Sequence, residues 1–113
     1  MGQRFKSLIE IINKKPDTVI IHTSTYSYYP TAYYLESNIN LLLTKNPLSN
    51  DTVQFIGGQK SQIPENENSF WLVDSKKWVD YNEYKILEKE FNKFNVVESF
   101  FYGNVELKYL ERN

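Results

Sequence analysis

The chain has 113 residues, a length that supports one domain with a buried core and is too short for two. Its 13 basic and 14 acidic residues give a formal net charge of -1, which excludes the basic surface that nucleic-acid binding requires. Cysteine is absent from the sequence, which excludes disulfides, zinc sites with thiolate ligands and thiol catalysis.

The hydrophobic pattern predicts strands that alternate with helices. Apolar residues at helical spacing indicate helices, and β-branched or continuously apolar runs between turn residues indicate strands. Pro30 suits the first turn of the second helix, and Asp80 or Asn82 can cap the third. The expected elements are a helix over residues 3–14, a strand over 18–23, a polar loop over 24–27, a helix over 31–35, strands over 40–44 and 52–56, an irregular polar segment over 59–69, a strand over 69–74, a helix after residue 80 or 82, and strands over 95–101 and 105–110.

This order predicts that residues 1–113 form a single α/β domain. Strands that alternate with helices imply a mostly parallel sheet with right-handed crossovers. The last two strands are joined by a tight turn, so they should form an antiparallel hairpin at one edge of the sheet. We therefore expect a small three-layer, Rossmann-like sandwich with a mostly parallel sheet and a C-terminal antiparallel hairpin.

Polar residues stand where two buried strands end. His22 ends the first strand, Ser24 follows it, and Asp74 ends the strand over residues 69–74. In open α/β sheets ligands bind outside the carboxyl ends of the strands, so these three are candidate ligand contacts. If the two strands are neighbours, His22 and Asp74 approach each other, and such a pair beside a serine suggests a hydrolase. The glycines of a nucleophile elbow are missing, however, and hydrogen-bonded structural roles for both residues are the stronger interpretation.

The sequence offers no motif for a cofactor or a metal. The run GGQKS at residues 57–61 departs from a phosphate loop because Gln59 separates the glycines from Lys60. The turn after the first strand lacks the glycines of a dinucleotide site. A single histidine leaves only carboxylates as metal ligands, and these lack the spacing of a calcium loop. We expect no cofactor, no metal and no catalytic residue in this chain.

Tyrosines are concentrated after the first strand. Aromatic residues make up 16% of the chain, more than a core of this size needs. Tyrosine combines a flat apolar face with a polar tip, so a cluster near the ligand edge is suited to sugar rings and their hydroxyls. The alternative is that the tyrosines pack the second helix onto the sheet. The cluster consists of Tyr26, Tyr28, Tyr29, Tyr33 and Tyr34, of which Tyr26, Tyr28 and Tyr29 join His22, Ser24 and Asp74 as candidate ligand-binding residues.

Several blocks of the sequence resemble one family of membrane enzymes. These blocks are VIIHTS at residues 19–24, YYP at 28–30, YYL at 33–35, FWLV at 70–73 and FYGNVELKYLER at 101–112. Together they are similar to the soluble C-terminal domain of polytopic glycosyltransferases of the protein mannosyltransferase-like family (family 39) of archaea and bacteria. The region around residues 54–68 has no counterpart in that pattern.

The resemblance implies an extracytoplasmic domain, part of a larger membrane protein and attached to its transmembrane helices. The full enzymes take a sugar from a lipid-phosphate donor, and their catalytic carboxylate lies in a loop between early membrane helices. This domain would then be a non-catalytic accessory part that covers the active site or aids acceptor recognition. Its expected partners are the transmembrane part of the parent chain and a glycan or polyprenyl-phosphate sugar. The alternative is a free-standing small binding or interaction module that uses the aromatic patch.

Overall fold

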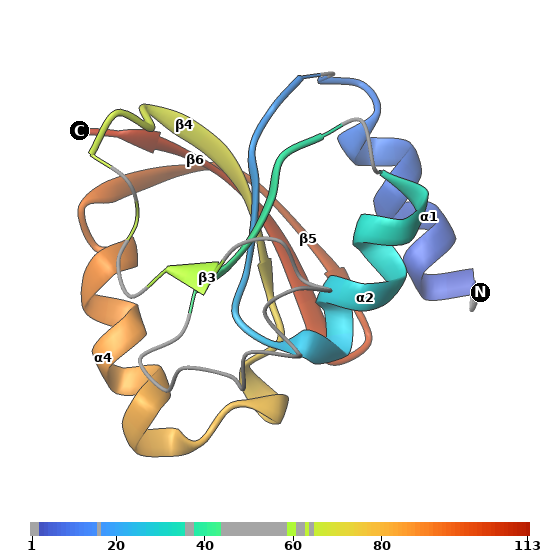
Figure 1. The fold of residues 1–113 in the computed structure, drawn as a ribbon. Helices are drawn as coiled ribbons and strands as arrows, with labels where there is room; N and C mark the ends of the chain where they lie inside the picture. Colours follow the sequence, from blue (N-terminus) through green and yellow to red (C-terminus); the bar gives the residue numbers. More distant parts are fainter. Residues whose placement is uncertain (1–2, 16, 36–37, 44–58, 61–62, 64) are drawn as a thin grey trace.

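A computed structural model describes residues 3–15, 17–35, 38–43, 59–60, 63 and 65–113 of the chain (Figure 1). Helices and strands alternate in it, as the hydrophobic pattern predicts. In chain order the elements are α1 (Gln3–Ile12), β1 (Ile20–His22), α2 (Thr25–Tyr34), β2 (Asn40–Leu43), β3 (Gln59–Lys60), β4 (Ser69–Asp74), a short 3-10 helix η1 (Lys76–Trp78), α4 (Tyr81–Phe91), β5 (Phe94–Tyr102) and β6 (Val105–Arg112).

The described strands form one mixed sheet in the order β3-β2-β1-β4-β6-β5. β1 lies between β2 and β4 and is parallel to both, and β3 is parallel to β2. β6 is antiparallel to β4 and to β5, and β5 and β6 are the two longest strands of the sheet. The predicted Rossmann-like sandwich with a mostly parallel sheet is therefore wrong, although the α/β class and the C-terminal antiparallel hairpin are confirmed.

The sheet is mixed because β6, the second strand of the C-terminal hairpin, lies between β4 and β5. β4, α4 and β5 form a crossover between two strands that run in the same direction, as helix-strand alternation predicts. A tight turn then sends β6 back into the space between β4 and β5. Gly103 has φ 66° in this turn, a left-handed conformation that glycine adopts without a steric penalty.

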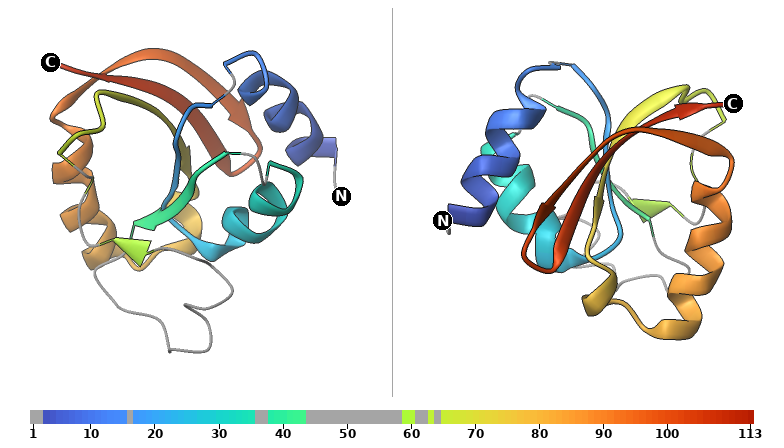
Figure 2. Two further views of the ribbon diagram at one scale, coloured as in Figure 1. Left: turned by 45° about the horizontal axis from the view of Figure 1, so that its top comes forward. Right: turned by 180° about the vertical axis from the view of Figure 1, so that it is seen from behind.

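Helices cover both faces of the sheet, with α1 and α2 on one face and α4 on the other (Figures 1 and 2). β4 contributes side chains to both layers: Trp71 and Val73 pack in the cluster that includes α1, whereas Phe70 and Leu72 pack in the cluster that includes α4. This explains why the strand is a continuous apolar run, since a strand buried on both faces has no solvent side.

Two local predictions need correction. Helix α2 begins at Thr25 and not, as expected, at Pro30, because the Ser24 hydroxyl caps it by accepting a hydrogen bond from the Tyr26 amide (3.0 Å). Pro30 therefore lies inside the helix. The segment expected to be irregular contains β3, which pairs with the end of β2. The strand expected over residues 52–56 falls outside the described residues. None of the described helices is both long and apolar enough to cross a membrane.

Candidate functional site

The candidate site lies where β1 and β4 end side by side. From β1 the chain continues through α2 on one face of the sheet, and from β4 it continues through α4 on the other face. Such a divergence is the topological switch point at which open α/β sheets bind ligands. The two strand ends are joined there: the Ser75 amide donates to the Thr23 hydroxyl (2.8 Å), and the Thr23 amide donates to the Val73 carbonyl (3.2 Å).

His22 is fully buried on the α2 face of the sheet, in a small polar cluster. Its Nε2 lies 3.1 Å from Asn40 Oδ1, and its Nδ1 lies 3.1 Å from the Ser27 hydroxyl. The Asn40 amide nitrogen donates to the carbonyls of Leu35 and Asn38, so the amide oxygen faces the imidazole. His22 Nε2 therefore carries the hydrogen and Nδ1, which faces the Ser27 hydroxyl, carries none in the neutral form of the ring.

Burial keeps the His22 ring neutral. Desolvation lowers the pKa of His22 from 6.5 to about 4, and the hydrogen bond to Asn40 opposes this shift only in part. Both ring nitrogens are engaged and the side chain is buried, so His22 does not present a free nitrogen to a ligand. These contacts fit the role of a hydrogen-bonded structural histidine.

Two tyrosines of the cluster, Tyr26 and Tyr28, pack within the domain, and so does Ser24. Tyr28 is buried, lies edge-on to His22 (5.1 Å between ring centroids), and donates its hydroxyl to the Asn40 carbonyl (3.4 Å). Tyr26 is half-buried and stacks on Trp78 of η1 (4.4 Å, 21° between planes). Ser24 is buried and serves as the cap of α2. These three candidate ligand contacts thus have structural partners within the domain.

The outer face of α2 carries the exposed tyrosines. Tyr29 is 46% exposed and Tyr33 is 75% exposed. Together with Tyr28 and Ala32 they line a hollow of about 520 Å³. Residues at i, i+1, i+4 and i+5 share one side of a helix, so α2 forms all of the lining that comes from described residues. This is an open aromatic surface of the kind that the sequence predicts, and it contains no charged lining residue among the described side chains.

Asp74 lies on the opposite, α4 face of the sheet. It is 4% exposed, accepts a hydrogen bond from the Tyr84 hydroxyl (2.5 Å) and forms an ion pair with Lys108 (3.5 Å). Desolvation raises the pKa of the Asp74 carboxyl, while Tyr84 and Lys108 act in the other direction. The pKa of Tyr84 is raised as well, by burial and by the carboxyl group it contacts. A carboxyl group with a raised pKa in a recess of the surface is a candidate for function.

The proposed pairing of His22 with Asp74 does not occur. The strands that carry them are neighbours, but the two side chains point to opposite faces of the sheet. The histidine-aspartate pair that the hydrolase hypothesis requires is therefore not formed. Within the described chain, no three or more histidine, aspartate or glutamate side chains gather closely enough to hold a metal ion.

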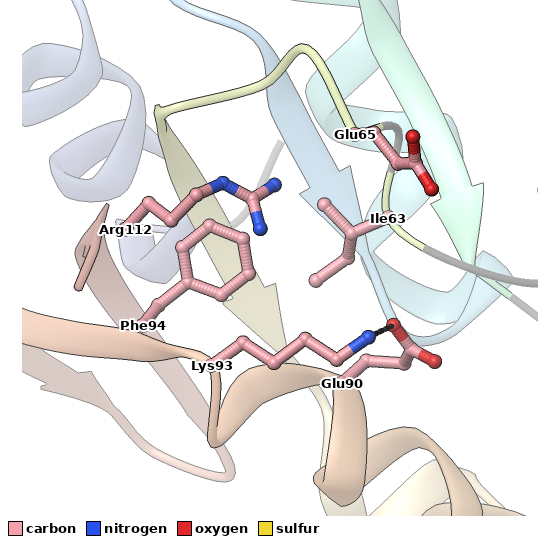
Figure 3. A pocket seen from close by; sticks show the side chains of 6 residues that line it. All are labelled: Ile63, Glu65, Glu90, Lys93, Phe94 and Arg112. Carbon is pink, nitrogen blue, oxygen red and sulfur yellow. Dashed lines mark hydrogen bonds and ion pairs between the residues drawn. The ribbon is translucent and has the colours of Figure 1, made fainter.

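A small pocket at the other end of β4 contains Arg112, which is not among the residues that the sequence predicts to bind a ligand (Figure 3). The Arg112 guanidinium lies over the Phe94 ring (4.6 Å) and donates to the Glu67 carbonyl from Nε (3.3 Å) and Nη2 (2.9 Å). Lys93 and Glu90 form an ion pair on the opposite wall (3.4 Å). The pocket holds about 70 Å³, which is small for an organic ligand, and we assign it a structural role. The only sequence signal for it was the final Arg112 of the resembling blocks.

Comparison with known proteins finds no family model and no curated protein that matches the chain.

Proposed function

We propose that this domain is the non-catalytic accessory part of a membrane glycosyltransferase that uses a lipid-phosphate sugar donor. In this role the domain covers the active site or aids acceptor recognition at the extracytoplasmic face, attached to the transmembrane part of its parent chain. The support is the order of the sequence blocks that resemble this family. In the fold these blocks fall on β1, on α2, on β4 and on the β5–β6 hairpin.

The observation that carries a binding role is the tyrosine hollow on α2. Its rim is formed by the exposed rings of Tyr29 and Tyr33, and its base includes the buried ring of Tyr28. Flat aromatic faces with hydroxyl tips suit a ligand that is apolar on one side and hydroxylated on the other, as a glycan is.

A free-standing binding module is the second candidate function. It is favoured by the same hollow, because the exposed aromatic rings of α2 can contact a ligand directly. In that case the ligand would be a carbohydrate or another aromatic-binding partner.

The test is an NMR titration of the isotope-labelled chain with a manno-oligosaccharide, a gluco-oligosaccharide and farnesyl phosphate. We expect saturable shifts in the α2 amides with at least one probe, and a loss of affinity of about fivefold or more in Tyr33→Ala, since an aromatic contact is removed. Tyr81→Ala is the matched control, because Tyr81 is a comparably exposed tyrosine (68%) on α4.

Binding of farnesyl phosphate supports the glycosyltransferase role, because a lipid phosphate is expected only for that function. Binding of an oligosaccharide without farnesyl phosphate supports a carbohydrate-binding surface, which both candidate functions include. If no probe shifts the α2 amides, or if Tyr81→Ala weakens binding as much as Tyr33→Ala, both functions are contradicted at this surface.

A further inference from the structure

A second recess lies on the α4 face of the sheet, beside the carboxyl end of β4. Its volume is about 330 Å³, at the lower end of the range of small-molecule sites. Asp74 of β4 and Glu106 and Lys108 of β6 form the sheet side, Tyr84 of α4 forms the helix side, and Phe101 of β5 stands at the rim. It is separate from the tyrosine hollow, since α2 lies on the opposite face of the sheet.

The polar groups of this recess are organised around the buried carboxyl of Asp74. Lys108 bridges two carboxylates, with its Nζ 3.5 Å from Asp74 Oδ2 and 3.4 Å from Glu106 Oε1. Tyr84 donates to the same Oδ2 atom. The second oxygen, Asp74 Oδ1, is buried and accepts no hydrogen bond from any group in the described part of the chain. A buried carboxylate oxygen without a donor is costly, so Tyr84 and Lys108 are the groups that hold this carboxyl in place beside the recess.

The charges around the recess exclude two classes of ligand. Among the described residues, its lining carries three carboxylates, on Asp74, Glu88 and Glu106, and two ammonium groups, on Lys76 and Lys108. The carboxylates would repel a phosphate or other anion, and Lys76 and Lys108 would repel an organic cation. The lining therefore does not favour a ligand with a net charge. A neutral ligand that both donates and accepts hydrogen bonds suits such a mixed lining.

An exposed aromatic ring narrows the class of neutral ligand further. Phe101 is 73% exposed, although it belongs to a long strand and lines the recess. Exposed phenylalanine has no polar tip to keep it in water, so a ring held at the rim of a polar recess suits contact with an apolar ligand face. A ligand with hydroxyl groups around its edge and carbon-bound hydrogens on its face has this combination.

We propose that this recess binds one neutral sugar ring, with the Glu106 carboxylate as an acceptor for its hydroxyls, Lys108 as a donor and Phe101 as the stacking surface. The volume fits a single ring and leaves little room for an oligosaccharide. This proposal does not rest on the function proposed for α2, because the two surfaces share no residue and lie on opposite faces of the sheet.

The experiment is a titration of the isotope-labelled chain with glucose, mannose, galactose and N-acetylglucosamine, followed by NMR. We expect saturable shifts at the amides around Asp74, in the Gly103–Asn104 turn and in the Phe101 ring with at least one of these sugars. Sodium phosphate and methylammonium chloride serve as the charged probes, and we expect neither to give saturable shifts there.

Two variants test the assignment of the contacts. Phe101→Ala removes only an exposed ring, so it should preserve the fold and weaken sugar binding about fivefold or more. Asp74→Asn keeps the size of the side chain but removes the charge that pairs with Lys108, so it should weaken binding by disturbing the position of that donor. Tyr33→Ala, on the opposite face, is the matched control and should leave the affinity at this recess unchanged.

The proposal is overturned if none of the four sugars shifts these amides, if phosphate or methylammonium binds there in their place, or if Phe101→Ala leaves the affinity unchanged. If the sugars give no shifts at this recess while the α2 amides still shift, only the present proposal is contradicted. Loss of the α2 shifts with retained binding at the recess removes only the function proposed for the tyrosine hollow.

Discussion

His22 and Asp74 end two adjacent parallel strands, yet their side chains lie on opposite faces of the sheet. In the register of β1 and β4, His22 is the partner of Val73, and Asp74 is one residue further along. Successive side chains of a strand alternate between faces, so this single step places Asp74 in the α4 layer and His22 in the α2 layer. Each then has its own partners, Ser27 and Asn40 for the imidazole and Tyr84 and Lys108 for the carboxyl.

The buried neutral imidazole predicts a stability that depends on pH. The pKa of His22 is about 4 in the folded chain against 6.5 as the unperturbed value, so the unfolded state binds the extra proton between these values. The contribution of His22 is therefore fully present above pH 6.5 and is lost as the pH falls toward 4, by at most about 3 kcal/mol. Urea unfolding across this window should show the loss.

His22→Gln provides the comparison for this prediction, because glutamine does not titrate and other groups are common to both proteins. The free energy of unfolding of the parent should fall relative to that of His22→Gln between pH 6.5 and 4. A constant difference between the two proteins over this range would mean that His22 is not held neutral by the fold.

Asp74→Asn is expected to stabilise the domain at neutral pH. The pKa of Asp74 is raised by burial, so its stabilising contribution is present at low pH and is lost as the pH rises through the folded-state value. At pH 7 the variant removes a buried charge while asparagine can still accept from Tyr84, and we expect a gain of about 1 kcal/mol. Chemical denaturation at pH 7 and near pH 4 measures it, and the gain should shrink at the lower pH.

Glu106→Gln is the control for that experiment, because Glu106 is a more exposed carboxylate beside the same lysine. It should change the free energy of unfolding by less than Asp74→Asn does. A clear destabilisation by Asp74→Asn at pH 7 would show that the charged carboxylate is a structural requirement of the fold and not a strained group.

The elements that could be predicted from the sequence are those that a local pattern defines. β4 was located by its apolar run, and α4 by Asp80, whose carboxylate accepts from the Asn82 and Glu83 amides. The sequence predicts a loop for the first turn of α2, because its residues are polar and Pro30 is typical of the first turn of a helix. In the structure Ser24 caps the helix, so that α2 starts at Thr25. The sequence alone does not distinguish this cap from a loop, because hydroxyl residues are common in both.

The rest of the fold depends on choices that no local pattern contains. The insertion of β6 between β4 and β5 is a tertiary pairing, and it turned an expected mostly parallel sheet into a mixed one. The register of β1 on β4 is another such choice, and a shift of one residue reverses the face of every side chain. The sequence therefore placed His22 and Asp74 at the correct edge of the sheet without revealing that they face apart.

Arg112 is expected to be a stabilising residue of the C-terminal strand. Its guanidinium packs on Phe94 and donates twice to the Glu67 carbonyl, which ties the start of β4 to the end of β6. Arg112→Ala should lower the free energy of unfolding by about 2 kcal/mol, through lost packing as well as lost hydrogen bonds. Arg112→Lys should recover only part of this, because lysine lacks the planar fork. Equal stability of the parent and both variants in thermal unfolding would contradict this role.

The cap of α2 gives a prediction that links stability to the tyrosine surface. Ser24→Ala removes the acceptor of the Tyr26 amide and should cost about 1 kcal/mol, with faster hydrogen exchange in the first turn of the helix. Asp80→Ala removes the cap of α4 and should raise exchange there and leave α2 unchanged.

Because Tyr28 and Tyr29 lie just beyond the capped turn, fraying in Ser24→Ala should also weaken ligand binding to the hollow, whereas Asp80→Ala should not. Exchange rates that rise equally in both helices for either variant would show that the caps report only global unfolding.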